Sequence, residues 1–170
     1  MEVSLRPVRD EADLEAVVGG PDGHHSEFNQ FGPASVMHLL TRFREHGLVE
    51  PHRGTLAVVA DGHAVGHVDY RAVPFGPVPR TEAWEIGISL LVPARGRGIG
   101  RRAQRLLADH LFAHTPAQRV QASTDITNVA EQRALDGAGF TREGILRSAQ
   151  WRLGTWHDLV LYSRLRSDAG

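Results

Sequence analysis

The residue types best suited to chemistry in this chain are the arginines and glycines of residues 95–100, which read Arg-Gly-Arg-Gly-Ile-Gly. They follow an apolar run at residues 84–92 and precede a helical pattern, so they are predicted to form a strand-to-helix turn. Glycine lets a backbone approach an anion closely, and the start of a helix directs N–H groups and the positive end of its dipole at one point. The segment therefore predicts a phosphate-binding loop, with nearby arginines adding charge. The alternative is an ordinary turn with surface arginines.

The spacing of this loop separates it from other phosphate-binding motifs. A P-loop ends in Gly-Lys-Ser/Thr, and a dinucleotide fingerprint places its third glycine where Arg101 stands. Arg-x-x-Gly-x-Gly after an apolar strand instead resembles the acyl-CoA pyrophosphate loop of the GNAT superfamily of N-acetyltransferases.

Length and composition limit the classes of protein that fit. With 170 residues, 41% hydrophobic and 23% charged, the chain is predicted to be one globular α/β domain over residues 1–170. A net charge of −1 offers no general attraction to nucleic acid or to an anionic membrane. The absence of cysteine excludes disulfides, thiolate metal sites and a cysteine nucleophile. The first residues lack the features of a signal peptide, so a cytoplasmic location is expected.

Hydrophobic periodicity and turn residues predict alternating strands and helices. Loops are expected at residues 19–32 and 74–79, and the order suggests a mixed sheet of about seven strands with helices on both faces. Strands are predicted at residues 3–8, 56–60, 64–72, 84–92, 119–124, 141–150 and 156–165; helices are predicted from residue 9, over 34–46, after the glycine loop as far as Thr115, and over 128–138.

The resemblance extends beyond the loop. Residues 128–140, which run from an asparagine to Gly-Phe, are similar to the helix after the fifth strand in GNAT enzymes. Residues 142–147 and 156–163 look like the last strands of the Rim-type branch, which contains the ribosomal-protein N-terminal acetyltransferases. The match runs from about residue 56 to residue 165. It implies a single GNAT-like acyl-CoA N-acyltransferase domain with a splayed central sheet.

The resemblance implies acetyl-CoA as co-substrate and direct attack by a primary amine in a ternary complex. The acceptor would be a protein N-terminus or a small-molecule amine; a non-catalytic acyl-CoA-binding module of the same fold is the alternative. RNA binding through the Arg/Gly segment is disfavoured by the net charge and by the lack of interleaved aromatic residues. The cofactor-binding residues that it implies are Leu90, Leu91, Val92, Arg95, Gly96, Arg97, Gly98, Ile99, Gly100, Arg101 and Asn128.

The catalytic residues implied are Glu85, as a base that relays the ammonium proton through water, and Asn128, which also suits a helix N-cap. His67 and His25 are alternative bases. Glu131 stands where the Rim-type branch often has serine; it is expected to be exposed and ionised, and not to protonate the leaving thiolate. Leu135 stands where many GNAT enzymes have an acidic tyrosine, so tyrosine acid catalysis is doubtful here.

Histidines and tryptophans leave two further hypotheses open. His110 and His114 are four residues apart but lack a third ligand, so no metal is expected and His110 is predicted to pack in the core. Trp84, Trp151 and Trp156 are interpreted as core residues or as the surface of a homodimer.

Overall fold

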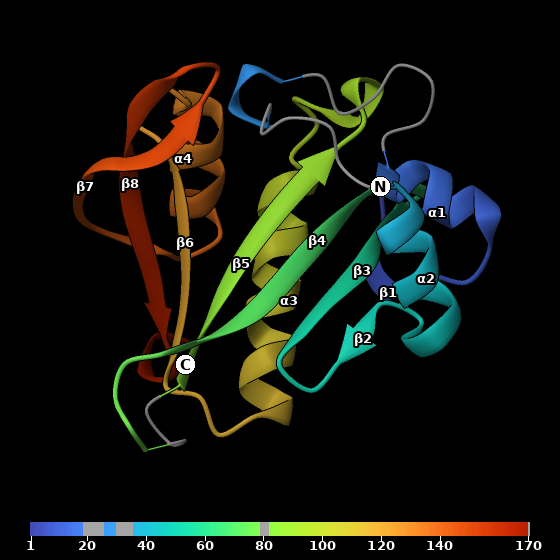
Figure 1. Ribbon diagram of the computed structural model, residues 1–170, viewed down its shortest axis with the longest axis horizontal. Helices are drawn as coiled ribbons and strands as arrows, with labels where there is room; N and C mark the ends of the chain where they lie inside the picture. Colours follow the sequence, from blue (N-terminus) through green and yellow to red (C-terminus); the bar gives the residue numbers. More distant parts are fainter. Residues whose placement is uncertain (19–25, 30–35, 79–81, 170) are drawn as a thin grey trace.

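The computed structural model describes residues 1–18, 26–29, 36–78 and 82–169, and it contains a mixed sheet flanked by helices (Figure 1). The strands are β1 (Val3–Pro7), β2 (Val49–Glu50), β3 (Arg53–Ala60), β4 (His63–Pro74), β5 (Glu82–Leu90), β6 (Arg119–Asp125), β7 (Thr141–Arg152) and β8 (Thr155–Leu165). The helices are α1 (Glu11–Val18), α2 (Val36–His46), α3 (Ile99–His114) and α4 (Val129–Gly137), with short 3-10 turns η1 (Glu27–Asn29), η3 (Val92–Ala94) and η4 (Arg166–Ala169).

The strand order within the described residues is β1-β3-β4-β5-β6-β8-β7, with β2 paired to β3 at the side. Every pairing is antiparallel except that of β5 with β6, which is parallel. These two strands pair only at Trp84↔Val120 and Glu85↔Gln121. Beyond that point they diverge, as Figure 1 shows, so the predicted splay is present in the middle of the sheet.

Alternation along the strands places apolar side chains on both faces of the sheet. Leu56 and Val58 of β3 pack in a core cluster with Leu107 of α3. Ala57, between them, packs on the other face with Leu14 of α1. The sheet therefore buries one face under α3 and the other under α1 and α2, which confirms the expectation of helices on both faces.

Two tight turns, each ending in glycine, close the hairpins of the sheet. Asp61 and Gly62 join β3 to β4 with φ angles of 49° and 86°, and Leu153 and Gly154 join β7 to β8 with 51° and 79°. Two consecutive positive φ angles match the right-handed twist of a hairpin. The two-residue strand β2 was not predicted, because two residues carry no periodic pattern.

Candidate functional site

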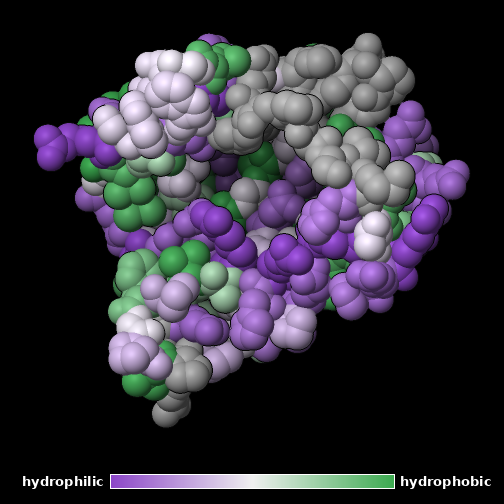
Figure 2. Space-filling view, in the orientation of Figure 1, coloured by the Kyte–Doolittle hydropathy of each residue, from purple (hydrophilic) through white to green (hydrophobic). Residues whose placement is uncertain are grey.

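A cavity of about 840 Å³ opens where β5 and β6 diverge. Figure 2 shows the surface hollowed in this region, with hydrophilic residues below the hollow and hydrophobic residues visible inside it. Its walls come from the end of β5, the turn before α3, the end of β6 and the first turn of α4. The gap left by the strands is thus bordered by the starts of two helices.

The glycine turn forms one end of this cavity. Gly96 and Gly98 adopt positive φ angles of 71° and 74°, and a Cβ built on either residue meets no atom within 4 Å. Gly98 is the N-cap of α3 and supplies no side chain to the first N–H groups, which have no acceptor within a helix. Since Gly98, Ile99 and Gly100 line the cavity, the turn has the geometry of an anion site.

The arginines of the turn take different positions. Arg95 and Arg101 line the cavity. Arg95 Nε also donates to the carbonyl oxygen of Leu90 at 3.0 Å. Arg97 lies 3.9 Å from the carboxylate of Asp61, and Arg102 donates to the carbonyl oxygen of Met1, so neither belongs to the cavity wall.

The predicted cofactor residues are brought together only in part. Leu91 donates its N–H to Val65 and accepts from Ala94, so its backbone is used within the protein. Val92 begins η3 and is exposed. The predicted residues that line the cavity are Leu90, Arg95, Gly96, Gly98, Ile99, Gly100, Arg101 and Asn128; those that do not are Glu85, Leu91, Val92 and Arg97.

Asn128 caps α4, as predicted. Its Oδ1 accepts from the Glu131 N–H at 3.3 Å, and its Nδ2 donates to Thr124 Oγ1 at 3.0 Å. An amide offers two donors and two acceptor sites, so one of each stays free for a second partner. The side chain lies on the cavity wall while it caps the helix.

The predicted exposure of Glu131 is wrong, because the residue is half-buried; that it does not protonate the leaving thiolate stays a prediction. Its side chain lines the cavity, and none of the ion pairs among the described residues includes it. Burial raises the pKa of Glu131 to about 7, although a hydrogen bond with Gln104 acts in the opposite direction. The carboxyl does not reach back to the helix start, because the Asn128 N–H already donates to Asp125.

The described candidate bases lie toward opposite ends of β5: Glu85 belongs to the last parallel pair, at the closed end of the splay, and His67 is paired with Ser89. Glu85 accepts from Arg71 at 2.6 Å and from Gln121 at 3.1 Å. His67 Nε2 on β4 lies 3.2 Å from the carboxylate of Asp69. His25 lies outside the described residues, as does the neighbouring His24. Leu135 is fully buried in the core cluster.

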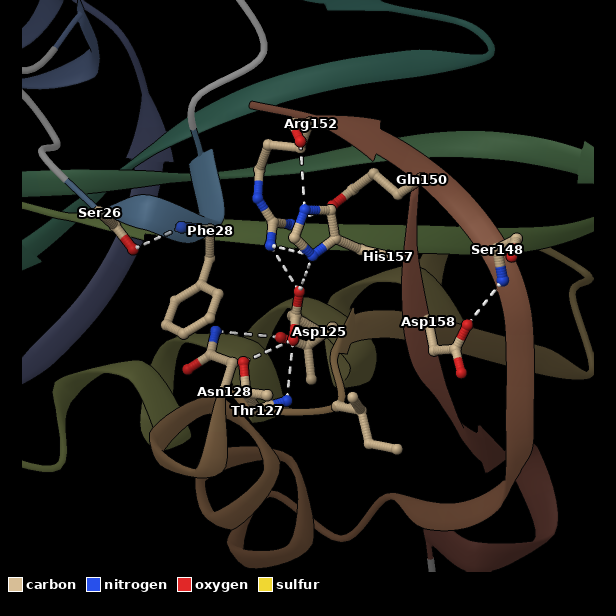
Figure 3. A network of polar contacts seen from close by, with 12 residues as sticks. Ser26, Phe28, Asp125, Thr127, Asn128, Ser148, Gln150, Arg152, His157 and Asp158 are labelled. Carbon is tan, nitrogen blue, oxygen red and sulfur yellow. Dashed lines mark hydrogen bonds and ion pairs between the residues drawn. The ribbon is translucent and has the colours of Figure 1, made fainter. Parts of the chain in front are cut away.

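A buried polar network that the sequence analysis missed lies behind the cavity wall beside α4, where Asp125 reaches the cavity (Figure 3). Arg152 and Asp125 are each 3% exposed and pair at 2.5 Å. His157 Nδ1 lies 3.1 Å from an Arg152 nitrogen, and the ring of Phe28 lies 5.7 Å from the Arg152 guanidinium carbon. Burial opposes ionisation of Asp125, but hydrogen bonds from Thr127 and Arg152 outweigh it and lower its pKa to about 2. The sequence gives no signal for this network, because Asp125 at the end of β6 and Arg152 at the end of β7 are far apart in the chain and come together only in the folded structure.

The structure places His110 and His114 side by side on the surface of α3. His110 is exposed and lies with its ring centroid 4.3 Å from that of His114, so its predicted core position is wrong. The buried face of α3 advances along residues 103, 107 and 111 and turns away from His110. Within the described residues, no three histidine, aspartate or glutamate side chains are grouped as metal ligands.

Trp84 is buried, whereas Trp151 and Trp156 are exposed and pack edge to face at 5.4 Å.

Comparison with known families decides the assignment. Residues 2–141 match the family described as acetyltransferase (GNAT) domain. The chain belongs to the GNAT family. Among its GNAT relatives is the probable N-acetyltransferase YjcK of Bacillus subtilis (strain 168), 34% identical over 83 residues. The aligned part is 49% of this chain and 46% of that protein, so the match spans about half the length of the curated relative.

Solved structures share the GNAT fold over nearly the whole chain. RimJ of Mycobacterium smegmatis, in complex with a CoA disulfide, has a TM-score of 0.78 and 24% identity, covering 98% of this chain and 83% of that one. The ribosomal-protein-S5-alanine acetyltransferase of Vibrio fischeri has a TM-score of 0.73 and 21% identity, covering 98% and 94%. At these identities the likeness establishes the fold. None of the described helices is long and apolar enough to span a membrane.

Proposed function

We propose that this GNAT protein transfers the acetyl group of acetyl-CoA to a primary amine by direct attack in a ternary complex. The observation that carries the proposal is the uncapped start of α3, whose two left-handed glycines open into the cavity between the diverging strands. Pyrophosphate bound there would lie against N–H groups and the positive helix end. The pantetheine arm would then run along the end of β5 toward Asn128.

Each side chain of the proposal has a stated task. Arg95 and Arg101 supply positive charge beside the pyrophosphate, and the backbone of Leu90 holds the arm. Asn128 uses its remaining amide capacity on the coenzyme. Glu85, on the opposite face of β5 from α3, takes the ammonium proton through water, because an ammonium is no nucleophile.

The acceptor end of the cavity is proposed to be the wall that contains Ser26, Phe28 and Gln150. A protein N-terminus and a small amine both present the required nucleophile. The resemblance to the Rim-type branch favours the protein class, whereas the fold is shared with both an S5-alanine and a spermidine acetyltransferase.

The direct test is a panel of primary amines, both N-terminal peptides and small molecules, with acetyl-CoA and the whole protein. We expect amine-dependent release of CoA, with one acetylated amine formed for each CoA released. Acetyl-CoA that binds but is never turned over with any amine would contradict the transferase proposal and favour the coenzyme-binding module.

A further inference from the structure

Gly87 lies in the middle of β5, where a glycine weakens a strand because it has no side chain to pack. A bulge does not explain it, since β5 pairs with β4 without a shift in register and Gly87 stands opposite Asp69. Its φ angle is not positive. A Cβ built on Gly87 meets no atom of the described residues within 4 Å. The fold of the strand therefore does not require a glycine here.

Two other strand glycines do have a reason in the packing. A Cβ on Gly54 would lie 2.4 Å from the ring of Tyr70, and a Cβ on Gly66 would lie 2.2 Å from the carbonyl oxygen of Ser89. Larger residues are excluded at both positions. The remaining common reason for a glycine inside a strand is the close approach of a ligand. Gly87 fits that reason, because it lines the cavity.

The bare backbone of Gly87 faces away from α3. The side chains of Ile88 and Leu90 reach to 3.7 Å from a Cβ built on Gly100, at the start of α3. Because successive residues of a strand face opposite sides of the sheet, residue 87 faces the other side, together with Glu85. Glu85 forms the last pair with β6, so Gly87 is the second residue beyond the point where the two strands separate.

The proposed acceptor wall lies on this same face of the sheet. Asp125 of β6 faces the same side as Gln121, four residues earlier, and Gln121 donates to Glu85 at 3.1 Å. Arg152 joins Asp125 to the acceptor wall, because it pairs with that carboxylate and also donates to Gln150. The open space at residue 87 is thus on the acceptor side of the cavity.

We propose that Gly87 borders the carbon that carries the acceptor amine, and that its missing side chain admits amines on a substituted carbon, R–CH(R′)–NH₂. This inference rests on the proposed acetyl transfer. Coenzyme held by the turn before α3 and an acceptor on the opposite face meet where β5 and β6 have separated. A substituent on the amine-bearing carbon then takes the volume that a Cβ at residue 87 would fill. The substrate class is the branched primary amines, which include a peptide N-terminus that begins with alanine.

The test compares acceptors that differ by one methyl group on the amine-bearing carbon. One pair is propylamine and butan-2-amine; the other is two peptides that begin with glycine or alanine and are otherwise identical. We expect the wild type to acetylate the branched member as well as the unbranched one. In Gly87→Ala, the added methyl group should lower kcat/KM for the branched member about ten- to two-hundredfold relative to the unbranched member.

Gly144→Ala is the matched control. A Cβ on Gly144 of β7 also meets no atom within 4 Å, and this residue does not line the cavity. The control should keep the wild-type ratio of the two kcat/KM values. Gly87→Ala should keep wild-type affinity for acetyl-CoA in calorimetry, because residue 87 faces away from the turn before α3. A folding defect would lower both kcat/KM values alike and leave their ratio unchanged.

The outcomes separate this inference from the proposed function. An unchanged ratio in folded Gly87→Ala, or a wild type that acetylates only unbranched amines, would overturn the role of Gly87 and leave the acetyl transfer intact. A wild type that binds acetyl-CoA but acetylates no amine would refute the transfer and the inference with it.

Discussion

Arg152 and Asp125 form the most buried ion pair among the described residues, and removal of the arginine would leave a carboxylate without its charged partner. Breaking such a pair typically costs about 3 kcal/mol or more. Arg152→Met should therefore lower the free energy of unfolding by about that amount in urea titrations. The exposed Arg147→Met, on the same strand, should change it by less than about 0.5 kcal/mol. Equal effects of the two substitutions would show that the pair adds nothing specific.

Glu85 is the residue whose proposed task is most open to a structural alternative, because Arg71 and Gln121 hold it where β5 and β6 still pair. If Glu85 is the base, Glu85→Gln should lower kcat by roughly ten- to a thousandfold and remove the acidic limb of the rate–pH profile. The affinity for acetyl-CoA should stay unchanged. Wild-type turnover in this variant would leave Glu85 with the task of joining the two strands.

Single residues show where sequence reasoning stops. The N-cap role of Asn128 is predictable, because an asparagine before a helical pattern has a local physical reason. The environment of Glu131 is not, because it depends on Gln104 from another helix and on a backbone bond in the preceding turn. The same holds for Arg152, whose partner Asp125 lies 27 positions earlier in the chain.

At the scale of elements, α4 combines a cap and a cavity wall in its first turn. Asn128→Ala removes the cap and should lower the free energy of unfolding by about 1 kcal/mol. Asn128→Asp keeps the cap and should stay within a few tenths of a kcal/mol of the wild type. A carboxylate at this position should still weaken acetyl-CoA binding, because it repels an anionic coenzyme. The affinity is measured by calorimetry of the folded Asn128→Asp protein. Wild-type affinity for acetyl-CoA would show that Asn128 caps α4 and does not contact the coenzyme.

Local sequence patterns predict the strands, helices and turns more reliably than they predict where two paired strands diverge. The hairpin turns at Asp61-Gly62 and Leu153-Gly154 and the glycine turn before α3 are visible in sequence, because positive φ angles favour glycine and its partners. The divergence of β5 from β6 was expected only from family resemblance. Nothing in the periodicity of either strand reports where their pairing stops.

At the scale of the whole molecule, the stability of the fold depends on pH through carboxyl groups of two kinds. Glu50 and Glu143 have lowered pKa values, and Glu131 has a raised one. Hydrogen bonds from Arg53 and Arg42 lower the pKa of Glu50 to about 2, and those from Arg119 and Ser163 do the same for Glu143. The stability that they contribute is present above pH 4.5 and is lost as the pH falls toward 2.

Glu131 binds its proton more tightly in the folded than in the unfolded chain, so its contribution is complete below pH 4.5 and is lost as the pH rises through about 7. Between these pH values the wild type should lose about 2 to 3 kcal/mol of unfolding free energy relative to Glu131→Gln. Urea titrations of both proteins across this range measure the difference. A difference that does not vary with pH would contradict the protonated state.

Binding of the coenzyme pyrophosphate by the turn before α3 can be measured directly, by calorimetric titration of acetyl-CoA into two matched variants. Gly98→Asp and Gly98→Asn have nearly the same shape and tolerate the left-handed conformation alike, but only the first adds a negative charge. We expect Gly98→Asn to bind acetyl-CoA measurably and Gly98→Asp to lose detectable binding while it remains folded. Equal, wild-type affinity in both variants would contradict the account.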